Sequence, residues 1–581
     1  MLSKYVIFEV SNQTTRELYT QINIKNYSMR KSALQIARAD YIPKMPSELR
    51  GNVKIVEGAP TGSLSDQEEI KKLFPNTYGL PIIKFDKDEG EVGTSEPLNM
   101  GVILSGGQAP GGHNVIAGIF DGIKKLNKDS KLYGFILGPT GLVDHQYKEL
   151  TGEIVDEYRN TGGFDIIGSG RTKLETKEQF DKGLVILKEL NIKALVIIGG
   201  DDSNTNAAVL AEYYKSINAG VQVIGCPKTI DGDLKNEYIE TSFGFDTACK
   251  VYSELIGNIQ RDCNSARKYW HFIKVMGRSA SHIALECALQ THPNICIVSE
   301  EVEAKESSLD DIIEYIAGVI AKRAEKGLNF GSIIIPEGLI EFIPAMKNLI
   351  SELNDFLAHN QEEFDLVRRS AKREYIISKL SPVNSEVYAS LPESVARQLT
   401  FDRDPHGNVQ VSLIETEKLL AEMVGKKLKK WTEEGKYVGK FATITHFFGY
   451  EGRCAAPSNY DTDYCYTLGY TASILAAAGK TGYISSVKNT TAQADKWVAG
   501  GVPTTMMLNL ERRHGEMKPV IQKALVELDG APFAYFKSKR EKWEIETAYV
   551  YPGPIQYFGP TEVCDQPSKT LQLEQTGKIE Q

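Results

Sequence analysis

At VQVIGCPKTIDGD (Val221–Asp233) a short apolar run passes directly into a loop that carries one lysine and two carboxylates. The run Val221–Gly225 is rich in β-branched residues and is soon followed by proline, which predicts a buried parallel strand that ends where the loop begins. In open α/β sheets the ligand crevice lies at the carboxyl ends of the strands. The loop Pro227–Asp233 is therefore expected at a binding site.

This loop carries residue types that phosphoryl transfer needs. Lys228 stands three residues before Asp231, and Asp233 follows two residues later. Such a transfer requires a base for the attacking hydroxyl, a metal ion, and cations where negative charge spreads; the loop can supply a base and a cation. The alternative for an isolated pair of acids with this spacing is an Asx-type turn beside a solvated lysine.

From residue 100 onward, short apolar runs alternate with helical patterns. The first run is followed by a stretch whose apolar residues Val115, Ile119, Ile123 and Leu126 share one helical face. Strands that alternate with helices predict parallel sheets with right-handed crossovers. The runs expected as strands are Gly101–Leu104, Leu132–Leu137, Phe164–Ile167, Ala194–Ile198, Val221–Gly225, His271–Met276, Ile295–Val298, Ser332–Ile335 and Ala442–Thr445.

So many units, in a chain longer than one core usually supports, predict more than one domain. We expect an α/β protein with two doubly wound, Rossmann-like parallel-sheet domains and the active site between them, plus an N-terminal extension and a helical insertion. The expected limits are an extension over 1–95, a first α/β domain over 96–260 with about 441–500, a second over 261–340, a mainly helical insertion over 341–440 and a C-terminal capping segment over 501–581.

Composition excludes some classes of partner. A net charge of −9 argues against general attraction to nucleic acid or to an anionic membrane. No apolar run approaches the roughly 18 residues that a membrane span needs. The first ten residues, MLSKYVIFEV, lack a signal-peptide pattern, and the eight cysteines form no C-x-x-C pair. Together these features predict a cytoplasmic protein with reduced thiols.

Two glycine-rich turns, Ser105–Gly112 and Gly199–Asn204, each link an expected strand to a helix. Backbone N–H groups at such a turn attract phosphate, although tight packing of strand on helix explains the glycines equally well. The first turn lacks the Lys-Ser/Thr of a P-loop. In the second, one acid could cap the helix, but the adjacent pair Asp201 and Asp202 favours Mg²⁺ beside a phosphate.

In order along the chain, seven motifs resemble those of the phosphofructokinase family, specifically its long pyrophosphate-dependent type: GGQAPGGHN, SGRT, GGDDSNTNA, PKTIDGD, MGRSASH, PEG and YEGR. The resemblance implies reversible Mg²⁺-dependent phosphoryl transfer from pyrophosphate to the 1-hydroxyl of fructose 6-phosphate, giving fructose 1,6-bisphosphate and phosphate in glycolysis or gluconeogenesis. It also implies that the first α/β domain binds the donor with Mg²⁺ and that the second binds the sugar phosphate.

The same resemblance implies roles for matching residues. Asp231 resembles the general base, Asp201 a ligand of Mg²⁺, and Arg171 a catalytic arginine near the transferred group. The residues implied for the sugar phosphate are Thr229, Ile230, Asp231, Met276, Gly277, Arg278, Glu337, Tyr450, Glu451, Gly452 and Arg453, with Lys268 and Tyr269 lent across a subunit interface. That last pair implies a homodimer or larger homo-oligomer with shared sites.

Donor choice is implied by Asp202 and Lys228, which stand where ATP-using relatives have glycine. Both are expected to take part in catalysis and, with Gly107, to bind the donor. The Asp202 carboxylate would repel the α-phosphate of ATP, whereas Lys228 would stabilise charge that develops on pyrophosphate. One departure from the family pattern is Gly232, where asparagine is frequent; glycine leaves the loop freer without changing its chemistry.

Other interpretations stay open. The residues also fit an ATP-dependent phosphofructokinase or a non-catalytic regulatory subunit that binds sugar phosphate, and the Gly-Gly-Asp turn alone fits a nucleotide or lipid kinase. Glu337 could be a turn residue and Arg278 a helix-start residue, while spacing alone favours a core position for Tyr450. His271 and His282 lack ligand spacing, so no transition-metal site is expected.

Overall fold

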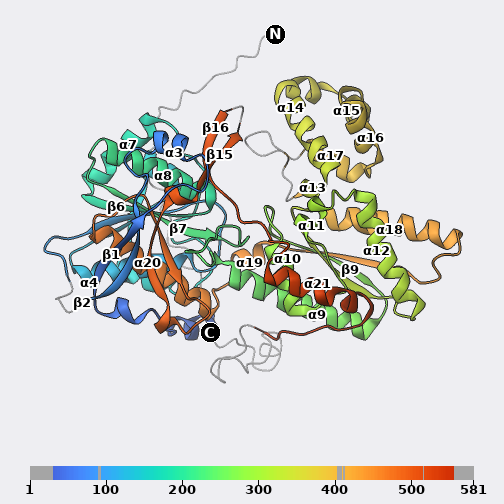
Figure 1. Cartoon of the computed structure of the whole chain (residues 1–581), viewed down its shortest axis with the longest axis horizontal. Coiled ribbons are helices and arrows are strands. Elements are labelled where there is room, and N and C mark those ends of the chain that lie inside the picture. The colour runs from blue at the N-terminus through green and yellow to red at the C-terminus, as the bar shows by residue number, and fades with distance from the viewer. Residues whose placement is uncertain (1–30, 89–92, 402–408, 410–412, 514–515, 555–581) are drawn as a thin grey trace, which may run out of the picture. The chain divides into compact units, whose positions relative to one another are not determined.

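The computed structural model describes residues 31–88, 93–401, 409, 413–513 and 516–554 (Figure 1). The chain divides into two units, one over 42–555 and one formed by 1–41 with 556–581. In the latter, helix α2 (Ala33–Ala39) begins after Ser32, whose hydroxyl accepts a hydrogen bond from the Gln35 N–H. No helix within the described ranges is long and apolar enough to cross a membrane. The remaining elements belong to the unit over 42–555.

A ten-stranded sheet forms the centre of one part of this unit (Figure 1). Its order is β1 (Asn52–Pro60), β2 (Pro81–Asp88), β14 (Val498–Pro503), β13 (Tyr483–Lys488), β7 (Gln222–Thr229), β6 (Ile192–Gly199), β3 (Asn99–Leu104), β4 (Leu132–Phe135) and β5 (Tyr147–Glu149), with β8 (Phe243–Gly244) paired to β7. Strands β13, β7, β6, β3 and β4 are parallel, which confirms the predicted α/β class. The flanking strands β14, β2, β1 and β5 pair antiparallel.

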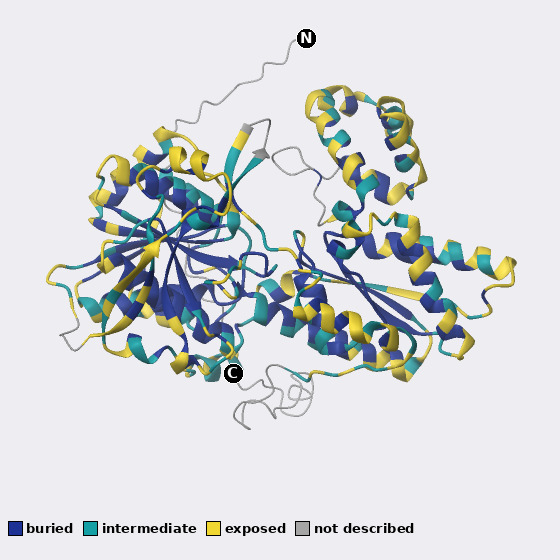
Figure 2. Ribbon diagram, in the orientation of Figure 1, coloured by how far each residue is buried: buried dark blue, intermediate teal, exposed yellow. Residues whose placement is uncertain are grey.

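The central strands are buried on both faces, because successive side chains point to opposite sides of a sheet. In β6, Val196 and Ile198 pack in one core, and Leu195 and Ile197 pack in another. Figure 2 shows these strands in the buried colour. Helices α4 (Gly112–Leu126), α6 (Gly152–Tyr158) and α20 (Asn459–Ala477) line the first core, and α5 (Pro139–Val143), α7 (Lys177–Glu189) and α8 (Asp201–Ser216) line the second. Coverage on both faces explains why Ala194–Ile198 of β6 is an unbroken apolar run.

Helices α4 and α20 approach each other closely at small residues. A Cβ atom on Gly118 would lie 2.1 Å from the carbonyl oxygen of Tyr466, and one on Gly469 would lie 2.0 Å from that of Val115. Neither position has room for a larger side chain. These glycines let the two helix backbones pack directly against each other under the sheet.

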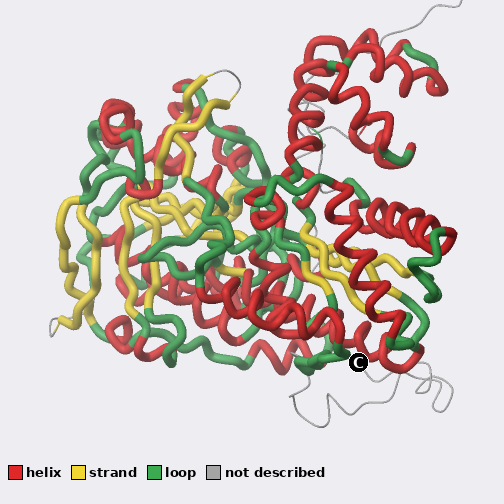
Figure 3. Tube along the Cα trace, turned by 45° about the vertical axis from the view of Figure 1, so that its right-hand side comes forward, coloured by secondary structure: helices red, strands yellow, loops and turns green. Residues whose placement is uncertain are grey.

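A second sheet has four parallel strands in the order β10 (Ile295–Cys296), β11 (Gly331–Pro336), β9 (Trp270–Val275) and β12 (Thr443–Phe448). On one face Ile273 and Val275 share a core with α9 (Phe245–Ala266), α10 (His282–Thr291) and α21 (Ala531–Ile545). On the other, Phe272 and Ile333 share a core with α12 (Leu309–Glu325) and α18 (Thr416–Glu433). Figure 3 shows strands of both sheets between helices.

Residues 339–401, nearly all of which lie within the segment 341–440 predicted as a helical insertion, are mainly helical. The helices are α13 (Leu339–Phe342), α14 (Pro344–Leu366), α15 (Lys372–Lys379), α16 (Pro382–Ser390) and α17 (Glu393–Phe401). Proline is the first residue of α14 and α16, where the missing N–H costs nothing. The predicted domain limits themselves remain a prediction.

A β-hairpin follows the large sheet and leads toward α21. It consists of β15 (Leu508–Arg513) and β16 (Glu516–Ile521). The N–H of Ile521 donates to Thr205 Oγ1 at 3.1 Å, and Leu508 shares a small core with Ala208. Both contacts dock the hairpin on α8, the helix that begins at Asp201.

One expectation about the strands was wrong. Phe164, Ile166 and Ile167 are buried, but the segment forms a turn closed by a 2.7 Å hydrogen bond from the Gly168 N–H to the Phe164 carbonyl. Gly163 and Gly168 on either side adopt positive φ and cannot continue a strand. In residues 1–95, expected as an N-terminal extension, strands β1 and β2 extend the large sheet. Most β1 side chains are exposed, so they lack the apolar pattern that identifies a strand in a sequence.

Candidate active site

Three loops are bonded together at the carboxyl ends of β3, β6 and β7. Ser203 Oγ donates to Ser105 Oγ at 2.8 Å, which joins the first two glycine-rich turns. Asn204 Nδ2 donates to the carbonyl oxygens of Gly199 and Cys226 at 2.6 and 3.4 Å, which joins the end of β6 to β7. These side chains hold the turns together at the carboxyl ends of the parallel strands, which is where α/β sheets bind their ligands.

The SGRT segment lies beside the first turn. The Gly106 N–H donates to the Gly170 carbonyl at 2.8 Å, and the next residue, Arg171, reaches Gly107. A Cβ atom on Gly107 would lie 2.9 Å from Arg453 Nη1 and 3.8 Å from Arg171 Nη2. Two guanidinium groups therefore face the backbone of this turn, and a side chain larger than that of glycine would have to displace the Arg453 guanidinium.

Lys228 brings a third cation to the same turn. A Cβ atom on Gly106 would lie 3.3 Å from Lys228 Nζ, and the lysine is only 5% exposed. Burial and the Arg453 cation lower the pKa of Lys228 to about 8, while the Asp231 and Asp201 carboxylates act in the opposite direction. Three cations around a glycine-rich turn form a site for an anion.

Asp231 presents a free acceptor beside these cations. Its Oδ1 lies 4.0 Å from Arg453 Nη2, is buried, and has no hydrogen-bond partner among the described residues. Its N–H donates to Thr229 Oγ1 at 3.0 Å, which fixes the loop. Burial, followed by the nearby Asp231 carboxylate, raises the pKa of Asp233 to about 7. The loop thus holds one acid for a ligand and a second that is easily protonated.

The two adjacent acids of the second turn have different neighbours. Asp201 begins α8, and its Oδ2 lies 3.5 Å from Lys523 Nζ. Asp202 Oδ1 lies 3.3 Å from Lys173 Nζ, and its side chain is half exposed. No group of three or more His, Cys, Asp or Glu side chains suited to a metal ion occurs in the described part of the chain. Asp201 is one carboxylate of the kind that Mg²⁺ takes together with oxygens of a ligand.

The loops after β9 and β11 face this cluster from the second sheet. Glu337 Oε2 accepts a hydrogen bond from the Gly277 N–H at 3.1 Å, which joins the PEG motif to the MGRSASH motif. Burial and then the Asp231 carboxylate raise the pKa of Glu337. A Cβ atom on Gly338 would lie 1.9 Å from the Arg278 carbonyl, so the two loops are in direct backbone contact.

Arg453, from α19 (Tyr450–Arg453), connects the loops of both sheets. Its Nε donates to Met276 Sδ at 3.0 Å, and its Nη1 donates to the Gln108 carbonyl at 3.3 Å. With Nη2 near Asp231, one guanidinium spans the first turn, the acidic loop and the end of β9. Such a placement suits the fork geometry of arginine, which offers five donors in one plane.

Other predicted site residues lie at the edges of this cluster or away from it. Ile230 is fully buried, which leaves only its backbone for a ligand. Tyr450 is 65% exposed, so the core position favoured by spacing is wrong, and Glu451 is also exposed. Gly452 packs against Tyr252, since a Cβ atom there would lie 2.5 Å from its ring.

Lys268 and Tyr269 lie at the other end of the second sheet. They precede β9, whereas Met276 follows it, and the six residues of that strand span about 20 Å. Within one chain they are therefore separated from the cluster. Their predicted contribution to a neighbouring subunit's site stays a prediction.

The sequence analysis missed residues that the C-terminal part brings to the site. Lys523 follows the hairpin and approaches Asp201. His282 Nε2 lies 2.8 Å from the Ala524 carbonyl oxygen, and the Ala524 N–H donates to the Asp233 carbonyl at 2.7 Å. No motif or spacing signalled these contacts, because the partners are more than 200 residues apart in the chain.

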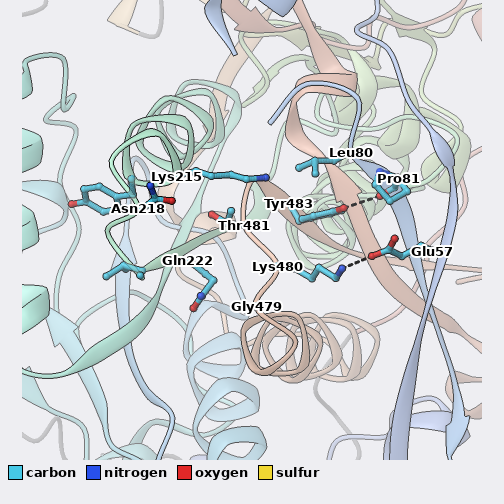
Figure 4. A pocket seen from close by; sticks show the side chains of 13 residues that line it. Glu57, Leu80, Pro81, Lys215, Asn218, Gln222, Gly479, Lys480, Thr481 and Tyr483 are labelled. Atoms are coloured by element: carbon cyan, nitrogen blue, oxygen red, sulfur yellow. Dashed lines mark hydrogen bonds and ion pairs between the residues drawn. The ribbon is translucent and has the colours of Figure 1, made fainter. Parts of the chain in front are cut away.

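A pocket of about 400 Å³ lies at the opposite, amino ends of β7 and β13 (Figure 4). Gln222 and Tyr483 line it, and the Tyr483 hydroxyl donates to the Pro81 carbonyl at 2.9 Å. Lys480 at its rim is paired with Glu57. This pocket is distinct from the cluster, which lies at the carboxyl ends of the same sheet.

Residues 99–475 match the family model described as phosphofructokinase. A pyrophosphate–fructose 6-phosphate 1-phosphotransferase of Porphyromonas gingivalis is 68% identical, covering 95% of this chain and all of the relative. One of Treponema pallidum (strain Nichols) is 54% identical and covers 94% and 97%.

The fold is similar to the crystal structure of a pyrophosphate-dependent phosphofructokinase from Nitrosospira multiformis, with a TM-score of 0.51 and 16% identity, covering 79% of this chain and 95% of that one. The length and identity of the matched sequences, together with this fold, lead to one conclusion. The chain belongs to the phosphofructokinase family, alongside relatives named pyrophosphate–fructose 6-phosphate 1-phosphotransferase.

Proposed function

We propose that this protein transfers a phosphoryl group reversibly from pyrophosphate to the 1-hydroxyl of fructose 6-phosphate, giving fructose 1,6-bisphosphate and phosphate. The names of relatives that match almost its whole length support this activity. The observation in the site that carries it is the buried Oδ1 of Asp231, which has no hydrogen-bond partner among the described residues and lies beside the cations that surround Gly106 and Gly107. A base and an anion site are thereby adjacent, as phosphoryl transfer requires.

Asp231 is the general base in this proposal. It takes the proton of the 1-hydroxyl as the sugar oxygen bonds to the phosphorus of the donor; the bridging P–O bond breaks, and phosphate leaves. The backbone of the first turn and Lys228, Arg171 and Arg453 stabilise the charge on the donor oxygens. Glu337 and the loop after β9 hold the sugar phosphate on the other side.

Asp201 is the residue proposed to hold Mg²⁺. Its place at the start of α8 beside the anion site fits an ion that takes one or two carboxylates and completes its shell with phosphate oxygens. When bound, Mg²⁺ supplies neutralisation of the charge on pyrophosphate. Lys228 is buried at the turn, so this chain also supplies a fixed cation of its own.

The assembly and location are part of the same proposal. A homodimer or larger homo-oligomer would let Lys268 and Tyr269 complete the site of a neighbour, since within one chain they are separated from it. A cytoplasmic location is supported by the cysteines Cys226, Cys249 and Cys263, which are free and buried.

The test compares wild type with Asp231→Ser for formation of fructose 1,6-bisphosphate from pyrophosphate, fructose 6-phosphate and Mg²⁺. Loss of a general base typically costs about 10²- to 10⁴-fold in rate, and a drop in kcat of that size is expected. Asp529→Ser, at an exposed acid outside the site, is the matched control and should keep wild-type activity. Equal, near-zero rates in wild type and Asp231→Ser would instead identify a non-catalytic subunit.

A further inference from the structure

The segment Gln522–Val526, between the hairpin and α21, is hydrogen-bonded to the loop after β7 and to helices α10 and α11 (Ser299–Ala304) beside the second sheet. On the large-sheet side the Ala524 N–H donates to the Asp233 carbonyl at 2.7 Å. On the other side the Ala524 carbonyl lies 2.8 Å from His282 Nε2, and the Val526 N–H donates to Glu300 Oε1 at 3.0 Å. This segment therefore crosses from the donor half of the site to the sugar half.

Lys523 is the charged residue of that segment. Its Nζ donates to Ser279 Oγ at 2.7 Å and lies 3.5 Å from Asp201 Oδ2. Ser279 follows Arg278 in the MGRSASH motif, and Asp201 is the acid proposed to hold Mg²⁺. One ammonium group thus contacts a donor-side acid and a sugar-side hydroxyl, from a part of the chain that carries none of the family motifs quoted above.

The electrostatics of the site fit a cation at this position. Asp201, Asp231 and Asp233 place three carboxylates at the ends of two neighbouring strands, and Lys228 and Lys523 are the lysines acting on them. The charge of Lys523 lowers the pKa of Asp233 and so partly offsets the increase that burial and the neighbouring carboxylates cause. Because the Lys523 side chain is about one-third exposed, its charge is partly screened by solvent. We therefore expect its main effect to be on the orientation of the side chains that it contacts.

We propose that Lys523 is a positioning residue for the transfer: through Asp201 and Ser279 it holds the donor half and the sugar half of the site in register. The inference rests on the proposed function, because register matters only if a phosphoryl group crosses between the halves. Misplacement of reacting groups by about 1 Å can cost about 100-fold in rate. Lys523 does not itself touch the reacting atoms in this account.

The experiment uses Lys523→Met, Ser279→Ala and the double variant in the full-length protein, with Lys537→Met, at an exposed lysine of α21, as the matched control. For Lys523→Met we expect kcat to fall about 10- to 100-fold with the KM values for pyrophosphate and fructose 6-phosphate changed less than about 3-fold. Ser279→Ala should lower kcat less, and the double variant should be no slower than Lys523→Met, because both changes remove one shared contact.

Unchanged kcat in folded Lys523→Met, or losses that multiply in the double variant, would overturn the inference. If Lys523→Met does not fold, Ser279→Ala and Lys523→Arg decide: a lower kcat in Ser279→Ala with partial retention in Lys523→Arg supports it, and wild-type kinetics in Ser279→Ala overturns it. A wild-type protein that makes no fructose 1,6-bisphosphate from pyrophosphate refutes the proposed function itself, so the two failures are distinguishable.

Discussion

Arg453 Nη2 lies 4.0 Å from Asp231 Oδ1, while the same guanidinium donates to Met276 Sδ and to the Gln108 carbonyl. The acid proposed as the base is therefore positioned by a side chain from α19 that also contacts the glycine-rich turn. Its own oxygen stays free for a substrate hydroxyl. Arg453 is therefore one of the residues through which the two sheets share one site.

The first prediction concerns Arg453→Lys, which keeps the charge but removes the planar fork. One ammonium cannot serve Met276, Gln108 and Asp231 together, so we expect kcat/KM for fructose 6-phosphate to fall about 10²-fold. Steady-state kinetics with each substrate varied in turn measure the change. The control is Arg540→Lys, whose guanidinium pairs with Glu301 outside the cluster; an equal loss in both variants would contradict the assignment.

A second prediction follows from the pKa of Lys228, which burial and Arg453 lower to about 8. The lysine is charged below that value and neutral above it, so kcat/KM for pyrophosphate should decline as pH rises through about 8. Lys228→Arg keeps its charge at any pH used and should remove this alkaline decline, even if its activity is lower. An alkaline limb at the same pH in both proteins would show that another group titrates.

Donor choice gives the third prediction. Asp202→Gly with Lys228→Gly removes the carboxylate that would repel ATP and the cation that serves pyrophosphate. We expect the ratio of kcat/KM for pyrophosphate to that for ATP to fall at least about 10-fold in the double variant. Lys173→Met, which removes the exposed partner of Asp202, serves as the control and should change the ratio less. A ratio unaffected by the double change would assign donor choice to other residues.

The fourth prediction tests the packing of α4 on α20. Gly118→Ala places a Cβ atom 2.1 Å from the Tyr466 carbonyl, so the helices must separate, at a cost of about 1 to 3 kcal/mol in free energy of unfolding. Gly318 is the matched control, because it lies inside α12 with nothing within 4 Å of an added Cβ. Gly318→Ala should be neutral or stabilise by up to about 1 kcal/mol through helix propensity. Urea unfolding measures both, and equal midpoints would contradict the close helix contact.

Much of the cluster was predictable because apolar parallel strands and their loops carry strong local signals. The apolar run before Cys226 forms most of the first part of β7. The end of this strand and the loop that follows it place Lys228 and Asp231 beside the glycines of the first turn. The adjacent acids Asp201 and Asp202 identified the second turn in the same way. These features are determined by residues close together in the sequence, so patterns in the sequence can identify them.

The rest depends on contacts that local patterns do not encode. Lys523 reaches Asp201 from 322 positions further along the chain and belongs to no motif. The exposed strand β1 lacks apolar alternation, and Phe164–Ile167 is apolar because it fills the core as a turn. In each case tertiary packing, rather than local preference, decides the structure.

The most direct test of the central claim is a donor assay on the wild-type protein. Formation of fructose 1,6-bisphosphate is measured at fixed fructose 6-phosphate and Mg²⁺ with either pyrophosphate or ATP as the phosphoryl source. We predict rapid product formation with pyrophosphate and little with ATP. A protein that uses ATP and leaves pyrophosphate unchanged would contradict the account.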